Sequence, residues 1–138
     1  MNEYEVSDIR VIDGDTFDCK IALGFDITLS QRIRLKDIDT PECRTKDPEE
    51  KRYGNLAKKE LIRLVKSAKK ATIACHPTRE KFGRVLAELW LDESSLFDEP
   101  CNVNQYLCDK HFAVPYSGQS KEEIAEQHLA NRKLLDAS

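Results

Sequence analysis

The sequence contains no long apolar segment. Of its 138 residues, 40% are hydrophobic and 34% are charged, and no stretch approaches the roughly 20 apolar residues that a membrane-spanning helix needs. Residues 1–10 carry charged side chains where a secretory signal would need a continuous apolar run. We therefore expect no membrane partner and a cytoplasmic protein, unless a leader has been removed.

The cysteines lack the spacing of a disulfide framework or a zinc site. There are five of them, an odd number, widely separated and without a C-x-x-C pair. We expect reduced thiols that behave as small and mostly buried hydrophobic residues. They are Cys19, Cys43, Cys75, Cys101 and Cys108.

An excess of positive charge is also missing. The formal net charge is −3, whereas a protein that held nucleic acid by a general basic surface would be strongly positive. Any affinity for phosphate therefore has to be local, from a concentrated cationic site or from a bound metal ion.

Alternating apolar residues predict β-strands in the first part of the chain. Residues 16–23 and 27–35 keep a strict two-residue period, with Arg34 on the polar face of the second run and Gly24 at a hairpin turn between them. Residues 4–12 have a similar pattern whose phase slips near Ser7, as at a β-bulge.

Later segments add two strands and three helices. Short apolar runs at 71–75 and 85–91 predict strands. Asp47 and Pro48 start a helix whose apolar stripe reaches Ala68. Cap signatures predict two further helices over the ranges 102–111 and 120–136.

This order of elements predicts an α+β fold, mainly β. A five-stranded OB-type Greek-key barrel with three helices fits better than a parallel α/β sheet, because β–α–β alternation is missing. The length is that of one domain, so residues 1–138 are expected to form a single unit.

Three polar clusters lie at strand ends or turns, where sites are usually built: 13–16, Arg34 with 39–42, and 81–84. Asp15, Asp39 and the carbonyl group of Thr40 could supply hard oxygen ligands to a calcium ion. Ordinary turn chemistry is the alternative for the Asp-Gly-Asp segment, and a solvated surface charge is the alternative for Arg34.

The segment that follows Arg34 places a cation, acidic groups and a threonine within one short loop. Cleavage of a phosphodiester needs fixed positive charge for the phosphoryl oxygens and an acceptor that orients the attacking water. This combination favours a catalytic or metal-binding role for the three clusters over ordinary turn residues and solvated surface charges.

In order and spacing, the clusters resemble the staphylococcal nuclease family, whose thermonuclease-like members are calcium-dependent phosphodiesterases. The likeness runs from about Tyr4 to Leu135. The segments that carry it are 11–16, 34–35, 39–42, 81–84, 102–104 and 126–129.

The resemblance implies one Ca²⁺ ion, held by the carboxylates of Asp15 and Asp39 and by the carbonyl group of Thr40. It implies that Glu42 contacts metal-bound water and acts as the proposed general base.

The resemblance also implies that Arg34 and Arg84 flank the scissile phosphate of a DNA and/or RNA substrate. In-line attack of water would then give 3′-phosphorylated products. Like the family, the chain would be a hydrolase with a nucleic-acid substrate.

The substrate-binding region departs from the family pattern. Phe82 stands where a tyrosine is common, so a hydroxyl group expected to reach the terminal phosphate is absent. Lys81 is a candidate phosphate contact or a solvated lysine. Tyr116 replaces two tyrosines of a base pocket and either stacks on a base or packs under its loop. We interpret His128 as structural.

Two alternatives from other classes remain. A catalytically weak or inactive family member would bind nucleic acid or protein without cleaving it. A generic oligonucleotide- or sugar-binding barrel would need exposed aromatic residues on a strand face, whereas Phe17 and Trp90 are expected on apolar sides. No obligate protein partner is evident, so we expect a monomer.

Overall fold

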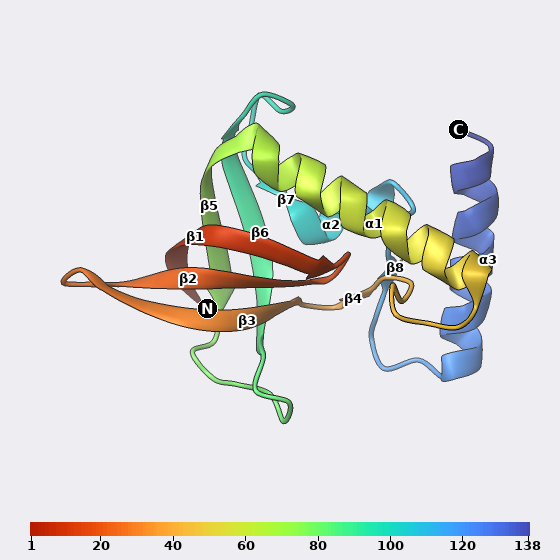
Figure 1. Ribbon diagram of the computed structural model, residues 1–138, viewed down its shortest axis with the longest axis horizontal. Coiled ribbons are helices and arrows are strands. Elements are labelled where there is room, and N and C mark those ends of the chain that lie inside the picture. The colour runs from red at the N-terminus through yellow and green to blue at the C-terminus, as the bar shows by residue number, and fades with distance from the viewer.

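The computed structural model describes residues 1–138, and its centre is a closed barrel of five long strands (Figure 1). Neighbours in the order β3-β2-β1-β5-β6 pair antiparallel, and a parallel pairing of β3 with β6 closes the ring. The predicted mainly-β, OB-type fold is confirmed. The strands are β1 (Asn2–Asp13), β2 (Thr16–Gly24), β3 (Ile27–Leu35), β5 (Ala68–Cys75) and β6 (Val85–Ser94).

The three predicted helices are present within a few residues of their expected bounds. They are α1 (Pro48–Ser67), α2 (Val103–Asp109) and α3 (Lys121–Asp136), capped by Asp47, Asn102 and Ser120. In Figure 1, α1 runs from beside α3 to the start of β5, on the side of the molecule away from the β2–β3 turn. None of the three helices combines the length and the apolar character needed to cross a membrane.

Three two-residue strands were not predicted, because segments this short have no periodicity. β7 (Cys101–Asn102) extends the barrel sheet at β6. β4 (Ile38–Asp39) pairs with β8 (Val114–Pro115) in a separate small sheet, which brings the segment after β3 next to the C-terminal part of the chain.

The core lies inside the barrel and under α1. Phe17, Ile33 and Leu89 from the strands and Leu61 and Leu64 from the helix are all fully buried. Burial of each such side chain stabilises the fold by about 1.5–3 kcal/mol. The apolar residues of the alternating pattern therefore form the inward face of the barrel.

Local features of the strands follow the sequence with one exception. The predicted bulge appears as a register shift between Ser7 and Arg10, with Asp8 at a φ of 51°. The expectation that Trp90 faces an apolar side was wrong, because it is 37% exposed opposite Thr72 and Asn102.

The five cysteines are all free. Cys19, Cys75 and Cys101 are buried, and the other two are partly buried, in line with the sequence-based expectation.

Helix α1 touches the loops at the end of the barrel through two glycines. A Cβ atom on Gly14, in the β1–β2 turn, would lie 2.6 Å from the Cβ atom of Ala57. A Cβ atom on Gly54, within α1, would overlap the backbone carbonyl oxygen of Glu42. The helix therefore packs directly on the backbone of both the 14–15 turn and the 41–42 segment.

This packing predicts that Gly54→Ala destabilises the protein. Alanine normally stabilises a helix by about 0.5–1 kcal/mol relative to glycine. Here the methyl group meets a backbone carbonyl that cannot rotate away, so overpacking should lower the free energy of unfolding by about 1–3 kcal/mol.

Urea denaturation measures this change, with Asn55→Ala as the matched control at the next, exposed position of the same helix. The control should be as stable as the parent or slightly more stable. An equal increase in the free energy of unfolding of Gly54→Ala and Asn55→Ala would contradict the close contact.

Candidate active site

A pocket of about 260 Å³ opens where the β1–β2 turn, the segment after β3 and the start of β6 meet. The six residues predicted to be catalytic or metal-binding all line it, although they come from distant parts of the sequence. The lining residues are Asp13, Asp15, Thr16, Arg34, Asp39, Thr40, Pro41, Glu42 and Arg84.

Asp15 is fixed in the turn between β1 and β2. The hydroxyl group of Thr16 donates to its Oδ1 at 3.0 Å, and the backbone N–H of Thr40 donates to its Oδ2 at 3.1 Å. Its own carbonyl accepts from the N–H of Leu35 at 2.8 Å. The Asp15 side chain is 11% exposed and is held in place before any ligand arrives.

Arg34 lies between the two predicted metal-binding carboxylates. Its Nη1 donates to the carbonyl groups of Leu35 and Ile38, both at 2.9 Å, and lies 3.3 Å from Oδ2 of Asp15. Its Nη2 is 3.5 Å from Oδ1 of Asp39. The side chain is only 17% exposed, so these partners offset the cost of taking its charge out of water.

Asp39 is also held by a residue from the far end of the chain. His128 of α3 places its Nε2 2.7 Å from Oδ2 of Asp39, and its side chain is 12% exposed. Sequence reasoning interpreted His128 as structural and missed this contact. No local signal could have shown it, because the contact depends on how α3 packs beside β4.

Glu42 is the acid of the pocket without an internal partner. It is exposed and forms no hydrogen bond or ion pair. Partial desolvation, followed by the negative charges of Asp15, Asp13 and Asp39, raises the pKa of its carboxyl group. Because the side chain is exposed, the effect of desolvation is modest, but the neighbouring charges act in the same direction.

Arg84 reaches the pocket from the residue before β6 and is oriented by Glu80. Its Nε and Nη2 atoms lie 3.1 and 3.2 Å from the two carboxylate oxygens of Glu80. Hydrogen bonds from Arg84 lower the pKa of Glu80 to about 2. Sequence reasoning did not single out Glu80, although its position four residues before Arg84 is compatible with this pair.

The predicted substrate-binding residues lie outside the lining of the pocket. Phe82 is 70% exposed, and its ring centre is 5.5 Å from the guanidinium carbon of Arg84 and 5.0 Å from Nζ of Lys81. These two residues therefore border Arg84. Tyr116 is 43% exposed beyond β8, with its N–H bonded to the carbonyl of Asp37, and the structure does not bring it to the pocket.

The lining of the pocket is rich in oxygen atoms. Calcium prefers carboxylates, carbonyl groups and water. Asp15 and Asp39 supply carboxylates, and the buried hydroxyl oxygen of Thr40 has no hydrogen-bond partner, so this corner of the pocket has unused oxygen lone pairs. No group of three or more His, Cys, Asp and Glu side chains forms a complete ligand set, so backbone oxygens and water would have to complete the coordination. With that addition, the donor chemistry fits calcium.

Comparison with known proteins agrees with the geometry. No curated protein matches the sequence. A family model described as staphylococcal nuclease homologue matches residues 32–134. This range begins after Asp15 and contains the predicted site residues Arg34, Asp39, Glu42 and Arg84. Because this match spans well over half of the sequence, the chain belongs to the staphylococcal nuclease homologue family.

Proposed function

We propose that residues 1–138 form one calcium-dependent nuclease domain that hydrolyses phosphodiester bonds of DNA and/or RNA. Water would attack the phosphorus atom in line with the leaving oxygen and give 3′-phosphorylated products. The observation that carries the proposal is one pocket lined by two arginines, Arg34 and Arg84, and by the acids Asp15, Asp39 and Glu42. Membership of the family supports a nuclease-like activity.

The two arginines suit a phosphate whose negative charge grows during the reaction. A guanidinium group stays charged and can donate to two oxygens at once. Arg34 is held by carbonyl groups and Arg84 by Glu80, so neither side chain has to be reorganised when the substrate binds. Preorganised donors of this kind stabilise a transition state more than a ground state.

Glu42 is the group best placed to accept a proton. Its carboxylate is not used by an internal hydrogen bond, so it can bind and orient a water molecule. Its raised pKa also makes it a stronger base than an ordinary glutamate.

Asp15, Asp39 and Thr40 are the residues that would hold the calcium ion. When bound, the ion would supply positive charge that polarises the phosphate. Asp15 and Asp39 are already oriented by Thr16, Arg34 and His128, so little side-chain freedom would be lost on binding.

The direct test uses single-stranded DNA with calcium and, in parallel, with an excess of chelator. We expect cleavage in calcium, loss of cleavage in chelator, and recovery when calcium is restored. Gel analysis with end-group determination would show fragments that carry 3′-phosphates. Intact strands retained by the protein in both conditions would instead identify a binding module.

Arg84→Ala should lower the rate of cleavage by about a hundred- to a thousandfold, the usual effect of losing one preorganised donor. The melting temperature should change little, because the backbone N–H groups of Phe82 and Arg84 still donate to Glu80 when the Arg84 side chain is removed. Single-turnover kinetics with saturating DNA would measure the loss.

The matched control is Arg63→Ala. Arg63 forms a similar forked pair with Glu60 on α1, beside Tyr106 of α2 and outside the lining of the pocket. Arg84 would have no specific role in catalysis if Arg63→Ala cleaved DNA as slowly as Arg84→Ala. The same would follow if Arg84→Ala cleaved DNA at the parental rate.

His128 should affect calcium affinity through Asp39. Loss of a partner that orients a metal ligand typically weakens metal binding about 10- to 100-fold. We expect this loss in His128→Leu and a smaller one in His128→Gln, which keeps a donor at the end of the side chain. Isothermal titration with calcium measures the affinity without relying on activity.

His76→Gln serves as the control, because His76 is exposed and remote from Asp39. Denaturation of each variant separates metal affinity from stability. Parental calcium affinity in His128→Leu would show that the contact only docks α3.

A further inference from the structure

The hairpin of β2 and β3 extends beyond the barrel. β1 stays paired with β2 only as far as Val6 opposite Ile21, and earlier residues of β1 pair with β5 alone. β2 and β3 remain paired to Gly24 opposite Ile27. The end of the hairpin is therefore a two-stranded ribbon that projects from the molecule, as Figure 1 shows. A ribbon of two strands is marginally stable on its own in water.

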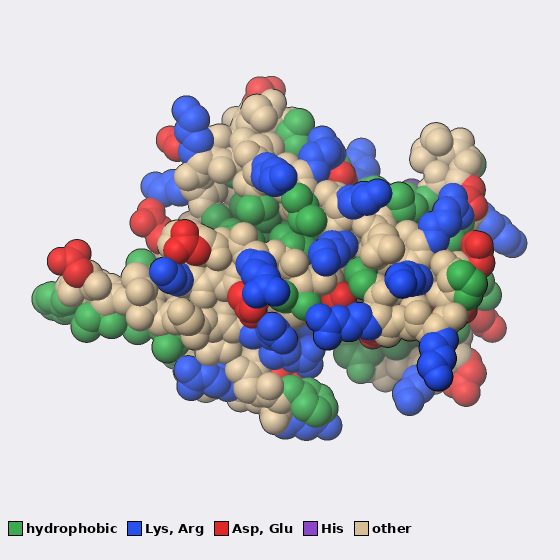
Figure 2. All heavy atoms as spheres, in the orientation of Figure 1, with side chains coloured by type: hydrophobic (Ala, Val, Ile, Leu, Met, Phe, Trp, Pro, Cys, Tyr) green, Lys and Arg blue, Asp and Glu red, His purple; other side chains and the backbone are tan.

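The inward face of the barrel continues along this ribbon with nothing to cover it. Leu23 is 47% exposed, Ile27 is 56% exposed, and Phe25 at the tip is 97% exposed. Figure 2 shows hydrophobic side chains gathered at this projecting end, with an acidic side chain beside them. Single exposed apolar residues are ordinary, but a contiguous group on one projection indicates a contact surface.

The backbone at the tip is unfavourable for the residue that occupies it. Phe25 has a φ of 54° and Asp26 a φ of 61°, in the left-handed region that asparagine, aspartate and glycine tolerate best. A bulky aromatic residue is strained there, and almost complete exposure leaves no contact within the chain to offset the strain. Such a residue is best explained by a contact outside the chain.

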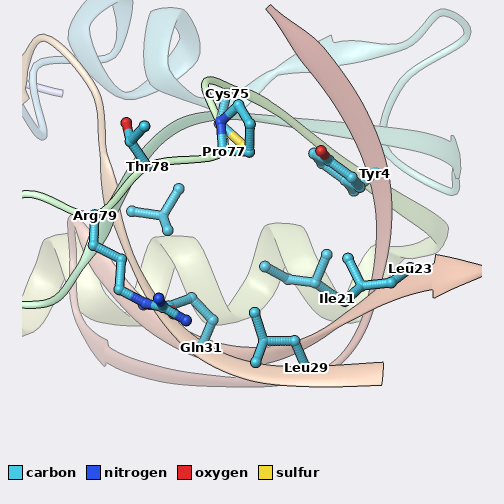
Figure 3. A pocket seen from close by; sticks show the side chains of 10 residues that line it. Tyr4, Ile21, Leu23, Leu29, Gln31, Cys75, Pro77, Thr78 and Arg79 are labelled. Carbon is cyan, nitrogen blue, oxygen red and sulfur yellow. The ribbon is translucent and has the colours of Figure 1, made fainter. Parts of the chain in front are cut away.

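A pocket of about 230 Å³ lies at the base of the same hairpin (Figure 3). This volume is below the roughly 300–1,000 Å³ of sites for drug-sized ligands, and it is large enough for one aromatic side chain. Six of its ten residues are hydrophobic. The lining residues are Tyr4, Ile21, Leu23, Leu29, Gln31, Cys75, Pro77, Thr78, Arg79 and Val85.

One end of this pocket carries an oriented positive charge. Nε of Arg79 donates to Oε1 of Gln31 at 2.8 Å, and Nε2 of Gln31 donates to the carbonyl of Gly83 at 2.8 Å. In Figure 3 the guanidinium group lies against Gln31, across the pocket from Tyr4 and Leu23. Arg79 forms no ion pair within the chain. The pocket therefore suits an apolar group that has a carboxylate beside it.

The tip of the hairpin presents this combination, because Asp26 follows Phe25 and has no ion pair of its own. We propose that two copies of the chain associate through their hairpins. Phe25 of each copy enters the pocket of the other, and Asp26 faces Arg79 across the contact.

The geometry permits both contacts at once. Leu23 lines the pocket and stands two residues from Phe25, so two hairpins that cross antiparallel bring each tip to the other copy's pocket. Such a contact is isologous and closes on itself as a dimer. Each phenylalanine can bury about 150–250 Å², so the two together bury about 300–500 Å², less than the roughly 1,200–2,000 Å² of stable specific interfaces. We therefore expect a weak dimer with a Kd on the order of 10–100 μM and a monomer in dilute solution.

Sedimentation equilibrium from low micromolar to near-millimolar protein tests the proposal. The parent chain should shift from monomer to dimer over this range. Phe25→Asn removes the aromatic ring and suits the left-handed backbone, so it should weaken association at least tenfold while the melting temperature holds or rises. Leu96→Asn removes an exposed apolar residue elsewhere on the surface and should leave association unchanged.

A charge exchange tests the geometry. Asp26→Lys and Arg79→Asp should each weaken the dimer, and the double variant should restore it. A monomer at every concentration, a dimer that persists in Phe25→Asn, or a double variant that fails to recover would overturn the proposal. Cleavage per chain in dilute solution should be unaffected by Phe25→Asn, so this test and that of nuclease activity fail independently.

Discussion

The contact on which the site depends is the arginine held between two acids. Arg34 lies on β3 directly opposite Thr16 of β2, so the strand pairing itself brings its guanidinium group to Asp15. Its bonds to the carbonyls of Leu35 and Ile38 then fix the bend that leads into β4. Without this cation, Asp15 and Asp39 would lose the positive group that lies between them, and their two carboxylates would repel each other. The same side chain therefore shapes the loop and lines the pocket in which phosphate binding is proposed.

Much of the barrel could be predicted from the sequence, because apolar residues at every second position indicate which face of a strand is buried. The phase slip near Ser7 indicated the bulge, and Asp47 capped α1 as predicted. For the site, the sequence indicated which residue types were suitable and the order in which they occur. The convergence of Asp15 with Arg84 was implied only by the family resemblance, and the folded chain places both residues in the lining of one pocket.

One feature that was missed depends on packing between distant segments. The contact of His128 with Asp39 requires α3 to lie beside the small β4–β8 sheet, and a two-residue strand leaves no pattern to detect. Trp90 was misplaced for a different reason, because it is out of phase with the buried Val85, Ala87, Leu89 and Leu91 and therefore lies on the outer face of the sheet. The alternation itself predicts this exposure, whereas the environment of His128 was selected by tertiary contacts.

The balance of charge in the pocket bears on how an acidic protein could act on nucleic acid. Four acidic side chains and two arginines line it, so the ionised pocket has an excess of negative charge. An anionic phosphate would be repelled from such a site. Partial desolvation raises the pKa of Glu42, and the neighbouring carboxylates raise it further. A divalent cation would cancel the excess and make the site receptive to phosphate. The local charge is therefore a reason, separate from the family resemblance, to expect that a divalent cation would promote the binding of phosphate.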